Sequence, residues 1–427
     1  MSQRAFIPTG VSIWTRRLLL ACCCGLLAAC MTSPFGTGSA VRKPPVPNAS
    51  PSASAPQQNQ ALSACVVLAL PDSGPFAPFA EKVRAGAVAA QQEMGKNGFR
   101  VDVRAVNTAQ ADWIAQVDAL PPSCAVVGGP LQAQSYSAAK AAGLTARRAV
   151  FAFLPQLAAG DEGKTAWRFF PGPEDQVAAL LRFTRELGIS SYGSFFPADA
   201  YGSRMNGLFE QAVRANGGTV RSASYPPADM IQWTKAAQQL VQPRMVNKVP
   251  LSTAAFEALF LPDSWKNMDM VTNSLLFNGE DRQVLLGTSL WELSLTGQNA
   301  VNTYNFQLAV FPGAWDPLRV PPGLQALPTR DFWVGLGYDF VRFGAALLLK
   351  PQSSPATVNA RIQQAQNIFW GMAPMHWTPQ GKASQQLFLF TPAPTGFVPL
   401  DIAAFKERRA QILSRFETRS RAAAAQQ

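Results

Sequence analysis

The stretch VVLALPDSGPFAPFAEKVRAGAVAA, residues 66–90, carries the pattern that decides the fold. It opens with an uninterrupted apolar run, passes through a turn of Pro, Asp, Ser and Gly, and continues with apolar residues at helical spacing to about residue 96. A short run that is apolar on both faces is typical of a strand buried in a parallel sheet. Asp and Ser in the turn favour the start of a helix. The stretch therefore predicts a buried strand followed by a helix.

The same alternation continues along the chain. The first group has expected strands at 65–70, 99–106, 124–127 and 149–153 and helices at 76–96, 111–120, 130–143 and 175–187. The second group has expected strands at 191–196, 219–224, 258–261 and 284–286 and helices at 201–216, 230–241 and 264–278. A strand at 306–311, a helix at 330–349 and a strand at 387–390 follow. The pattern predicts an α/β protein of two lobes, each a doubly wound parallel sheet with helices on both faces.

Residues 1–29 have the features of a secretory signal peptide. Arg4, Arg16 and Arg17 precede an apolar run over 18–30, and this segment contains no acid. A basic segment, a short apolar segment and small residues before a cleavage point are the anatomy of such a signal. The apolar run has 13 residues, fewer than the roughly 20 that span a membrane.

The junction Leu27-Ala28-Ala29-Cys30 resembles the bacterial lipobox. The resemblance implies cleavage before Cys30 and lipid attachment to its thiol, whose acyl chains would anchor the protein to a membrane. A plain secretory signal with an incidental cysteine is the alternative. Met31, not Asp, follows the cysteine, which in many Gram-negative lipoproteins implies sorting to the outer membrane. We expect a lipid-anchored envelope protein that faces the periplasm, at the outer membrane.

Residues 30–62 are rich in Pro, Ser and Ala and lack apolar periodicity, which predicts a disordered tether. The net charge of the whole chain is +11, and loss of the three arginines of the leader leaves +8. Outside the cytoplasm, a basic protein is expected to meet anionic lipid or wall polymer and no nucleic acid.

Two cysteines, Cys65 and Cys124, belong to the predicted folded region. They begin two strands that would be neighbours in a sheet of order 2-1-3, and thiols in an oxidising compartment can pair. Two separately buried cysteines are the alternative. With a single His and no CxxC motif, the sequence offers no metal site.

Four segments resemble the type I periplasmic binding proteins of the leucine/isoleucine/valine class. They are residues 66–90, RFFPGPEDQ at 168–176, FFPADAYGSRMNGLFEQAVRANGGTV at 195–220 and FWVGLGYDFVRFGAALL at 332–348. The resemblance implies two lobes joined by hinge crossings. It places the first lobe at 63–182 plus about 300–349 and the second at 183–299 plus about 350–402. The basic residues that follow predict a C-terminal helix or tail at 403–427.

Three further segments are similar to the binding-protein-like domain of the LpoA/LppC group. They are VVGGPLQAQS at 126–135, EALFLPDSWKNMDMVTNSLLFNG at 257–279 and VLLGTSLWE at 284–292. Members of that group are outer-membrane lipoproteins that activate penicillin-binding proteins. The resemblance implies that a peptidoglycan synthase is a partner. The helical repeat domain of the full-length members is not expected here, because the tether leads directly into the first lobe.

Ligands of open α/β sheets bind at the carboxyl ends of the strands, where helix N-termini offer free N–H groups. The candidates on these loops are Ser73, Gly74, Gly129, Pro130, Leu131, Gln156, Ser264 and Thr288. In amino-acid-binding members of the family, hydroxyls of two first-lobe loops hold the ligand carboxylate. Ala133 and Ala158 stand at the matching positions.

The other half of that constellation is present. Asp175 could meet a ligand ammonium group, and Tyr201 is the aromatic residue after the first strand of the second lobe. Each has a structural alternative: Asp175 could favour a helix dipole, and Tyr201 could pack at a helix start.

We expect no catalytic residues and no cofactor, because His376 stands alone and no nucleophile, phosphate-binding or metal motif occurs. Two functions remain open. One is an activator of peptidoglycan synthesis, and the other is a lipoprotein that binds an amino-acid-like solute for an ABC transporter or a sensor. A wall-directed enzyme is a third, weaker hypothesis, with Asp72, Asp175 and Asp199 as its acids.

Overall fold

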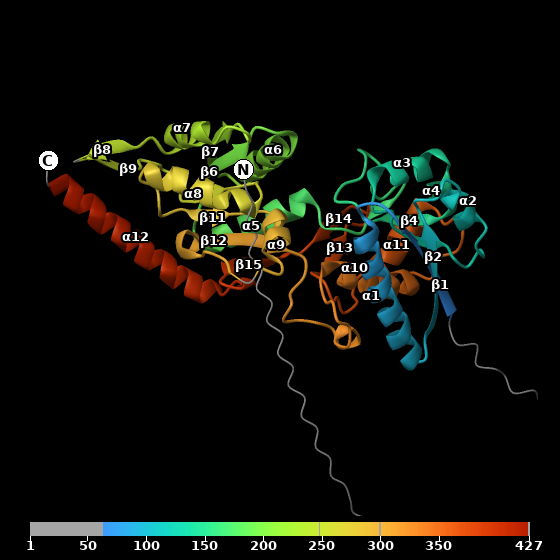
Figure 1. The fold of residues 1–427 in the computed structure, drawn as a ribbon. Coiled ribbons are helices and arrows are strands. Elements are labelled where there is room, and N and C mark those ends of the chain that lie inside the picture. The colour runs from blue at the N-terminus through green and yellow to red at the C-terminus, as the bar shows by residue number, and fades with distance from the viewer. Residues whose placement is uncertain (1–62, 247, 299, 426–427) are drawn as a thin grey trace, which may run out of the picture. The chain divides into compact units, whose positions relative to one another are not determined.

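The computed structural model describes residues 63–246, 248–298 and 300–425. The predicted signal peptide, the lipid attachment at Cys30 and the whole predicted tether lie outside these residues. Among the described helices, none combines the length and apolar character needed to cross a membrane. The described residues form two α/β lobes, as the alternation of strands and helices predicts (Figure 1).

The sheet of the first lobe is fully parallel and has the order β2-β1-β3-β4-β5. Its strands are β1 (Ser63–Leu70), β2 (Arg100–Asn107), β3 (Val126–Gly128), β4 (Ala149–Ala152) and β5 (Trp167–Arg168). The helices of this lobe are α1 (Ala77–Lys96), α2 (Trp113–Asp118), α3 (Ala133–Ala141), α4 (Leu144–Arg147), α10 (Phe332–Ala346) and α11 (Pro355–Ala365).

The sheet of the second lobe has the order β16-β15-β12-β11-β10-β6-β7. Its parallel strands are β6 (Ser191–Pro197), β7 (Thr219–Tyr225), β10 (Ala258–Phe260), β11 (Val284–Leu286) and β12 (Ala309–Gly313). The antiparallel strands β15 (Phe388–Ala393) and β16 (Gly396–Pro399) extend one edge. The helices are α5 (Pro173–Glu186), α6 (Ala200–Ala215), α7 (Met230–Val241), α8 (Met268–Phe277), α9 (Ser289–Leu295) and α12 (Ile402–Ala425).

Two small hairpins and three short 3-10 helices complete the described chain. The hairpins are β8 (Arg244–Val246) with β9 (Val249–Leu251), and β13 (Met375–Trp377) with β14 (Ala383–Gln385). The 3-10 helices are η1 (Trp265–Asn267), η2 (Tyr304–Phe306) and η3 (Pro322–Leu324).

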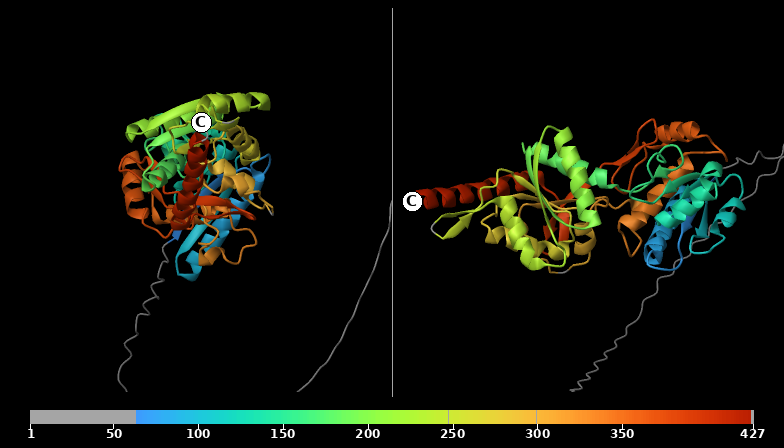
Figure 2. Two further views of the ribbon diagram at one scale, coloured as in Figure 1. Left: turned by 90° about the vertical axis from the view of Figure 1, so that its left-hand side faces the viewer. Right: turned by 90° about the horizontal axis from the view of Figure 1, so that it is seen from above.

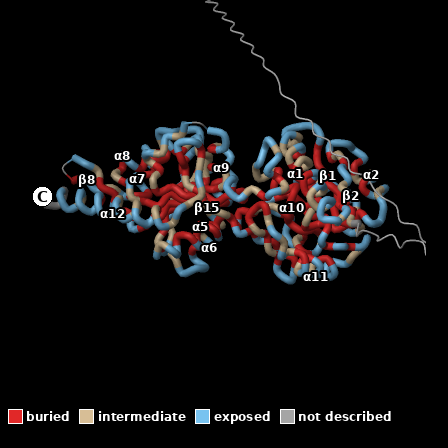
Figure 3. Tube along the Cα trace, turned by 90° about the horizontal axis from the view of Figure 1, so that it is seen from below, coloured by how far each residue is buried: buried red, intermediate tan, exposed pale blue. Residues whose placement is uncertain are grey.

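Both faces of each sheet are buried, which explains the uninterrupted apolar runs in the sequence. In β1, Val66, Leu68 and Leu70 face the core formed with α1 and α10, whereas Val67 and Ala69 face the core formed with α2, α3 and α4. The strands of the second lobe divide between two cores in the same way. Figures 2 and 3 show helices on both sides of the sheets and buried residues concentrated in the strands.

Helices α1 and α10 pack closely because glycines stand where they meet. A β-carbon on Gly86 would lie 1.9 Å from the carbonyl oxygen of Val334, and one on Gly337 would lie 1.8 Å from that of Val83. No side chain larger than hydrogen fits at such distances. The segment 332–348 is far from α1 in sequence, so this contact fixes the late helix in the first lobe.

The structure sets the lobes at different bounds from those expected from the sequence. Strand β12 extends the second sheet, although 300–349 was expected in the first lobe. Residues of α11, β13 and β14 pack in the core of the first lobe, although 350–402 was expected in the second. Helix α5 packs mainly with the second lobe. An apolar strand pattern predicts that a strand is buried but not which sheet it joins. The pattern therefore could not assign residues 300–402 to one lobe or the other.

The basic C-terminal segment is a helix that packs on the second lobe. Phe405 of α12 is buried against Phe183, with ring centroids 5.2 Å apart. Arg409 and Arg419 pair with Glu257 and Asp281 of the lobe at 2.7 Å each. Part of the positive charge of this helix is therefore used in contacts with its own lobe.

A disulfide joins Cys65 of β1 to Cys124, which lies just before β3. Strands β1 and β3 are parallel neighbours, so the two cysteines lie at the same end of adjacent strands. The loop that the bond closes spans a sequence separation of 59 residues and contains α1, β2 and α2. The crosslink therefore constrains the first lobe.

We expect the double variant Cys65→Ala/Cys124→Ala to lose about 2–4 kcal/mol of unfolding free energy, because the unfolded chain regains the freedom of that loop. Urea denaturation under non-reducing conditions measures the loss. The wild-type protein treated with a reductant should fall to the same value. Equal stability of the oxidised and variant proteins would contradict a structural disulfide.

Candidate functional site at the strand ends

The second-lobe candidates gather at the carboxyl ends of β6, β10 and β11. The Tyr201 hydroxyl donates a hydrogen bond to Thr288 Oγ1 at 3.2 Å, and Thr288 is fully buried. Thr288 also caps α9 by accepting from the backbone N–H of Leu290 at 3.4 Å. Ser264 follows β10, the strand that pairs with β11, and its Oγ lies 3.4 Å from the Oγ of Ser294 on α9. The fold brings these hydroxyl groups to one edge of the sheet.

Burial raises the pKa of the Tyr201 hydroxyl, and nearby Asp263 and Asp199 add to this effect. The phenol therefore stays protonated at neutral pH and acts as a hydrogen-bond donor. Tyr201 is 37% exposed, so its ring can also be reached from solvent. The position suits recognition of a polar group rather than proton transfer.

Two further residues of this edge were not predicted. Asp263 accepts hydrogen bonds from the Tyr225 hydroxyl at 2.6 Å and from Asn267 Nδ2 at 2.9 Å. Gln176 Oε1 accepts from the backbone N–H of Ser289, the first residue of α9, at 2.9 Å. Asp263 lies in the loop after the predicted strand at 258–261, next to the candidate Ser264, so its place in the sequence could have shown it. Nothing near Gln176 in the sequence indicates its distant partner.

The first-lobe candidates divide into an exposed loop and a buried turn. Ser73 and Gly74 are exposed after β1. Arg84 fixes this loop by donating to the carbonyls of Leu70 and Pro71 and by pairing with Asp72. The loop thus presents the Ser73 hydroxyl to solvent.

Gly129, Pro130 and Leu131 are buried where β3 ends. The Gly129 N–H donates to the carbonyl of Phe151 at 2.9 Å, and the Pro130 carbonyl accepts from Phe153 at 3.2 Å. Gly129 has a φ of +97°, and a β-carbon there would lie 2.3 Å from the carbonyl of Ala69. These groups are used within the lobe, which leaves little for a ligand.

Gln156 and Asp175 are also held by protein partners. The Gln156 side-chain oxygen accepts a hydrogen bond from Arg204 of α6. Asp175 Oδ2 accepts from Arg168 Nη1 at 2.6 Å and from the Gly172 N–H at 2.7 Å, and Oδ1 accepts from the Gln385 N–H at 3.1 Å. Asp175 is 5% exposed. It is a buried structural acid that caps α5, and it does not offer a free carboxylate to a ligand ammonium group.

Ala133 is the first residue of α3, so no side-chain hydroxyl is present at that helix start. Ala158 lies in the loop after β4. His376 lies in the middle of β13, opposite Ser384 of β14. Among the residues that the structure describes, no group of three or more His, Cys, Asp or Glu could hold a metal ion.

Several solved structures share this architecture at low sequence identity. A Rhodospirillum rubrum protein described as a branched-chain amino acid ABC transporter superposes with a TM-score of 0.61 at 15% identity, covering 80% of this chain and all of its own. A substrate-binding protein from Desulfitobacterium hafniense in complex with Leu gives 0.56 at 15% identity, with 79% and 100% covered.

The C-domain of LpoA from Haemophilus influenzae, described as a regulator of PBP1A, gives a TM-score of 0.57 at 14% identity, covering 79% of this chain and all of that domain. This chain has the type I periplasmic binding protein fold. Of full-length LpoA from the same organism it spans 59% of the length. The sequence matches no protein-family model, and no curated protein matches it.

A second acid, Glu292 on α9 of the second lobe, lies close to Asp331, which caps α10 of the first lobe. Burial and, to a smaller extent, the negative charge of Asp331 together raise the pKa of the Glu292 carboxyl from 4.5 to about 8. Asp331 itself pairs with Lys82 at 2.6 Å. Glu292 is therefore protonated in the folded protein at neutral pH.

This shift predicts a pH-dependent loss of stability. The unfolded chain releases the Glu292 proton near pH 4.5 and the folded chain near pH 8, so the folded state loses relative stability as the pH rises between these values. Glu292→Gln removes the effect. We expect the stability of this variant relative to the wild type to rise by about 1.4 kcal/mol or more from pH 5 to pH 9. Thermal and urea unfolding measure it, with the exposed Glu417→Gln as control. Parallel pH curves for E292Q and the wild type would exclude the shift.

Proposed function

We propose that this protein is a non-catalytic, lipid-anchored envelope protein that activates a peptidoglycan synthase by contact, as a penicillin-binding protein activator. The observation that carries the proposal is the state of Asp175. The acid that would meet a ligand ammonium group is buried and bound by Arg168, Gly172 and Gln385. A fold whose ligand groups are used internally is available to act through its outer surfaces.

Two further observations support this choice. Alanines stand at both positions where amino-acid binders use hydroxyls, Ala133 and Ala158. A ligand carboxylate there would lack donors, and an under-satisfied buried charge is costly. The similarity to the LpoA C-domain is the second observation, together with the lipobox-like sequence before Cys30.

Three tryptophans in the last third of the chain are buried and do not contribute to an exposed aromatic surface. Trp291, Trp315 and Trp377 are at most 4% exposed. One group of exposed apolar side chains lies at the β8–β9 hairpin and the end of α8. Met245, Val249 and Phe277 are 62%, 53% and 72% exposed. The two elements meet closely, because a β-carbon on Gly279 would lie 2.2 Å from the carbonyl of Pro250.

We expect the hairpin end to contribute to synthase binding, since exposed apolar residues grouped in this way mark protein contacts. The test uses the purified lipoprotein and a purified bifunctional peptidoglycan synthase of the same cell in liposomes. Binding and a several-fold faster glycan polymerisation are expected. Phe277→Glu should weaken binding at least tenfold, whereas Leu318→Glu, at a residue 78% exposed elsewhere, should not. A synthase that neither binds nor accelerates contradicts the proposal.

The alternative function is capture of an amino-acid-like solute for an ABC transporter or a sensor. The Tyr201–Thr288 pair at the strand ends favours it, as does the likeness to the Leu-bound protein. A thermal-shift screen of free amino acids separates the two functions, because a bound ligand raises the melting temperature. If our proposal is right, any rise in melting temperature caused by an amino acid should be the same in the wild type and in Tyr201→Phe. A shift of several degrees that Y201F removes would establish the alternative.

A further inference from the structure

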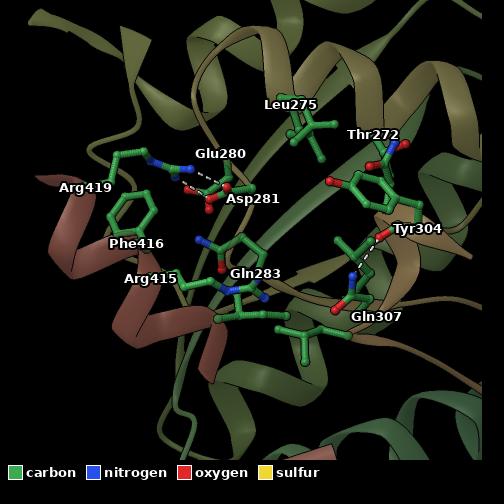
Figure 4. Close-up of a pocket in the computed structure, with 15 residues that line it drawn as sticks. Thr272, Leu275, Glu280, Asp281, Gln283, Tyr304, Gln307, Arg415, Phe416 and Arg419 are labelled. Carbon is green, nitrogen blue, oxygen red and sulfur yellow. Dashed lines mark hydrogen bonds and ion pairs between the residues drawn. The ribbon is translucent and has the colours of Figure 1, made fainter. Parts of the chain in front are cut away.

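A cavity of about 360 Å³ lies between α12 and the second lobe, away from the strand ends described above (Figure 4). Its walls come from α8 and the loop that follows, from β11, from η2 and from α12. The volume is within the range of small-molecule sites in proteins. The functions proposed above do not use this cavity.

The floor of the cavity holds polar groups that lack protein partners. Gln283 is 4% exposed, and neither its amide nitrogen nor its amide oxygen has a hydrogen-bond partner among the described residues. Glu280 is 2% exposed, and its Oε2 is likewise unpartnered. A buried polar group without a hydrogen-bond partner costs free energy. A bound molecule that supplies the missing donors and acceptor would remove this cost.

The other carboxylate and one arginine of the cavity are already paired. Arg419 of α12 donates two hydrogen bonds to Asp281, both at 2.7 Å, and the bond to Asp281 raises the pKa of this guanidinium. Figure 4 shows this contact at one end of the cavity and Tyr304 at the other. The pair fixes α12 over the cavity. Glu280 Oε1 accepts a hydrogen bond from the backbone N–H of Arg282 at 3.1 Å and lies 3.5 Å from Arg282 Nε, which leaves Oε2 of this carboxylate for a bound molecule.

Arg415, one turn before Arg419, also lines the cavity. It is exposed, and no ion pair or hydrogen bond is formed by its side chain with the described residues. A second hollow shares Arg415 and Gln307 with the cavity and is lined further by Ala410, Gln411 and Ser414. The recess therefore continues outward along α12, with a positive group where the two parts meet.

Part of the remaining wall is apolar. Leu275, Leu285, Leu308, Ile412 and Phe416 line it. A molecule bound here would place apolar groups against these side chains, a cation or N–H donor at Glu280, an amide-like group at Gln283 and an anion at Arg415.

We propose that this cavity binds a short peptide or an amino acid with an apolar side chain, its ammonium group at Glu280, its backbone amide or carboxyl group at Gln283 and its carboxylate at Arg415. The adjoining hollow favours a peptide over a single amino acid. Such a ligand would bridge α12 and the lobe, so binding would also stabilise the packing of the C-terminal helix.

The test titrates the whole mature protein with leucyl-leucine, with free leucine, and with leucyl-leucine that is N-acetylated or C-amidated, by calorimetry. The dipeptide is expected to bind with a one-to-one stoichiometry. Acetylation should weaken it at least tenfold, because the ammonium group no longer reaches Glu280 as a cation. Amidation should weaken it less, by the loss of the Arg415 pair.

Variants locate the site. Glu280→Gln should reproduce the effect of acetylation, and Arg415→Ala the effect of amidation. Arg415 is exposed, so R415A tests the proposal even if E280Q does not fold. Asp269→Asn on α8 and Arg421→Ala on α12 are matched controls outside the lining and should bind as the wild type does.

Three results would overturn the proposal. One is no saturable binding of any probe at millimolar concentration, and another is equal binding by E280Q, R415A and the wild type. The third is binding that depends on Tyr201 rather than on these residues, which would place the ligand at the strand ends. The synthase assay is independent of all three, so this site and the proposed function can fail separately.

Discussion

The buried ion pair between Arg168 and Asp175 joins segments of the molecule that are far apart in the sequence. Arg168 ends β5 of the first lobe and also donates to the carbonyls of Phe170 and Ala383 at 2.6 Å each. Asp175 lies in the first turn of α5 and accepts from Gln385 in β14. One charge pair thus ties the crossing between the lobes to the late hairpin. Both partners are almost fully buried, so loss of Arg168 would leave the Asp175 charge without its cation, whereas after loss of Asp175 the arginine would keep only its longer contact with Glu162 at 3.4 Å.

That constraint also shapes the function. A carboxylate that holds the crossing together cannot at the same time be released to bind a ligand ammonium group without cost to the fold. The same two-lobed architecture can therefore serve either solute capture or protein contact, depending on whether its polar groups at the crossing are free or occupied. Here they are occupied, and this state favours a role through outer surfaces and through the cavity beneath α12.

Much of the fold could be predicted from the sequence because strands buried on both faces leave a plain signature. The apolar run of β1 and the helical spacing of α1 predicted both elements closely, and the two-lobed α/β class followed. The division of residues 300–402 could not be predicted, because β12 is a short apolar strand that fits either sheet and no strand was predicted at the β13–β14 hairpin. The contact of Gly86 and Gly337 with α10 and α1 is visible only once the helices are placed.

The site was predicted less well, for a physical reason. Position at a strand end predicts that a residue reaches the edge of the sheet, as Tyr201 and Thr288 do, but it does not predict the partners that use its polar atoms. The role of Asp175 depends on Gln385, 210 residues away, and no local pattern contains that information. The cavity at Gln283 depends in the same way on the packing of α12.

A double-mutant cycle on the crossing pair tests the account most directly. The unfolding free energies of Arg168→Met, Asp175→Asn and the double variant are measured by urea denaturation. The account predicts a loss of about 3–5 kcal/mol for each single variant and a double variant far more stable than the sum of the two losses implies. Additive losses, or wild-type stability of D175N, would show that the Asp175 carboxylate is not held by contacts within the fold. Asp175 would then again be a candidate for binding a ligand ammonium group.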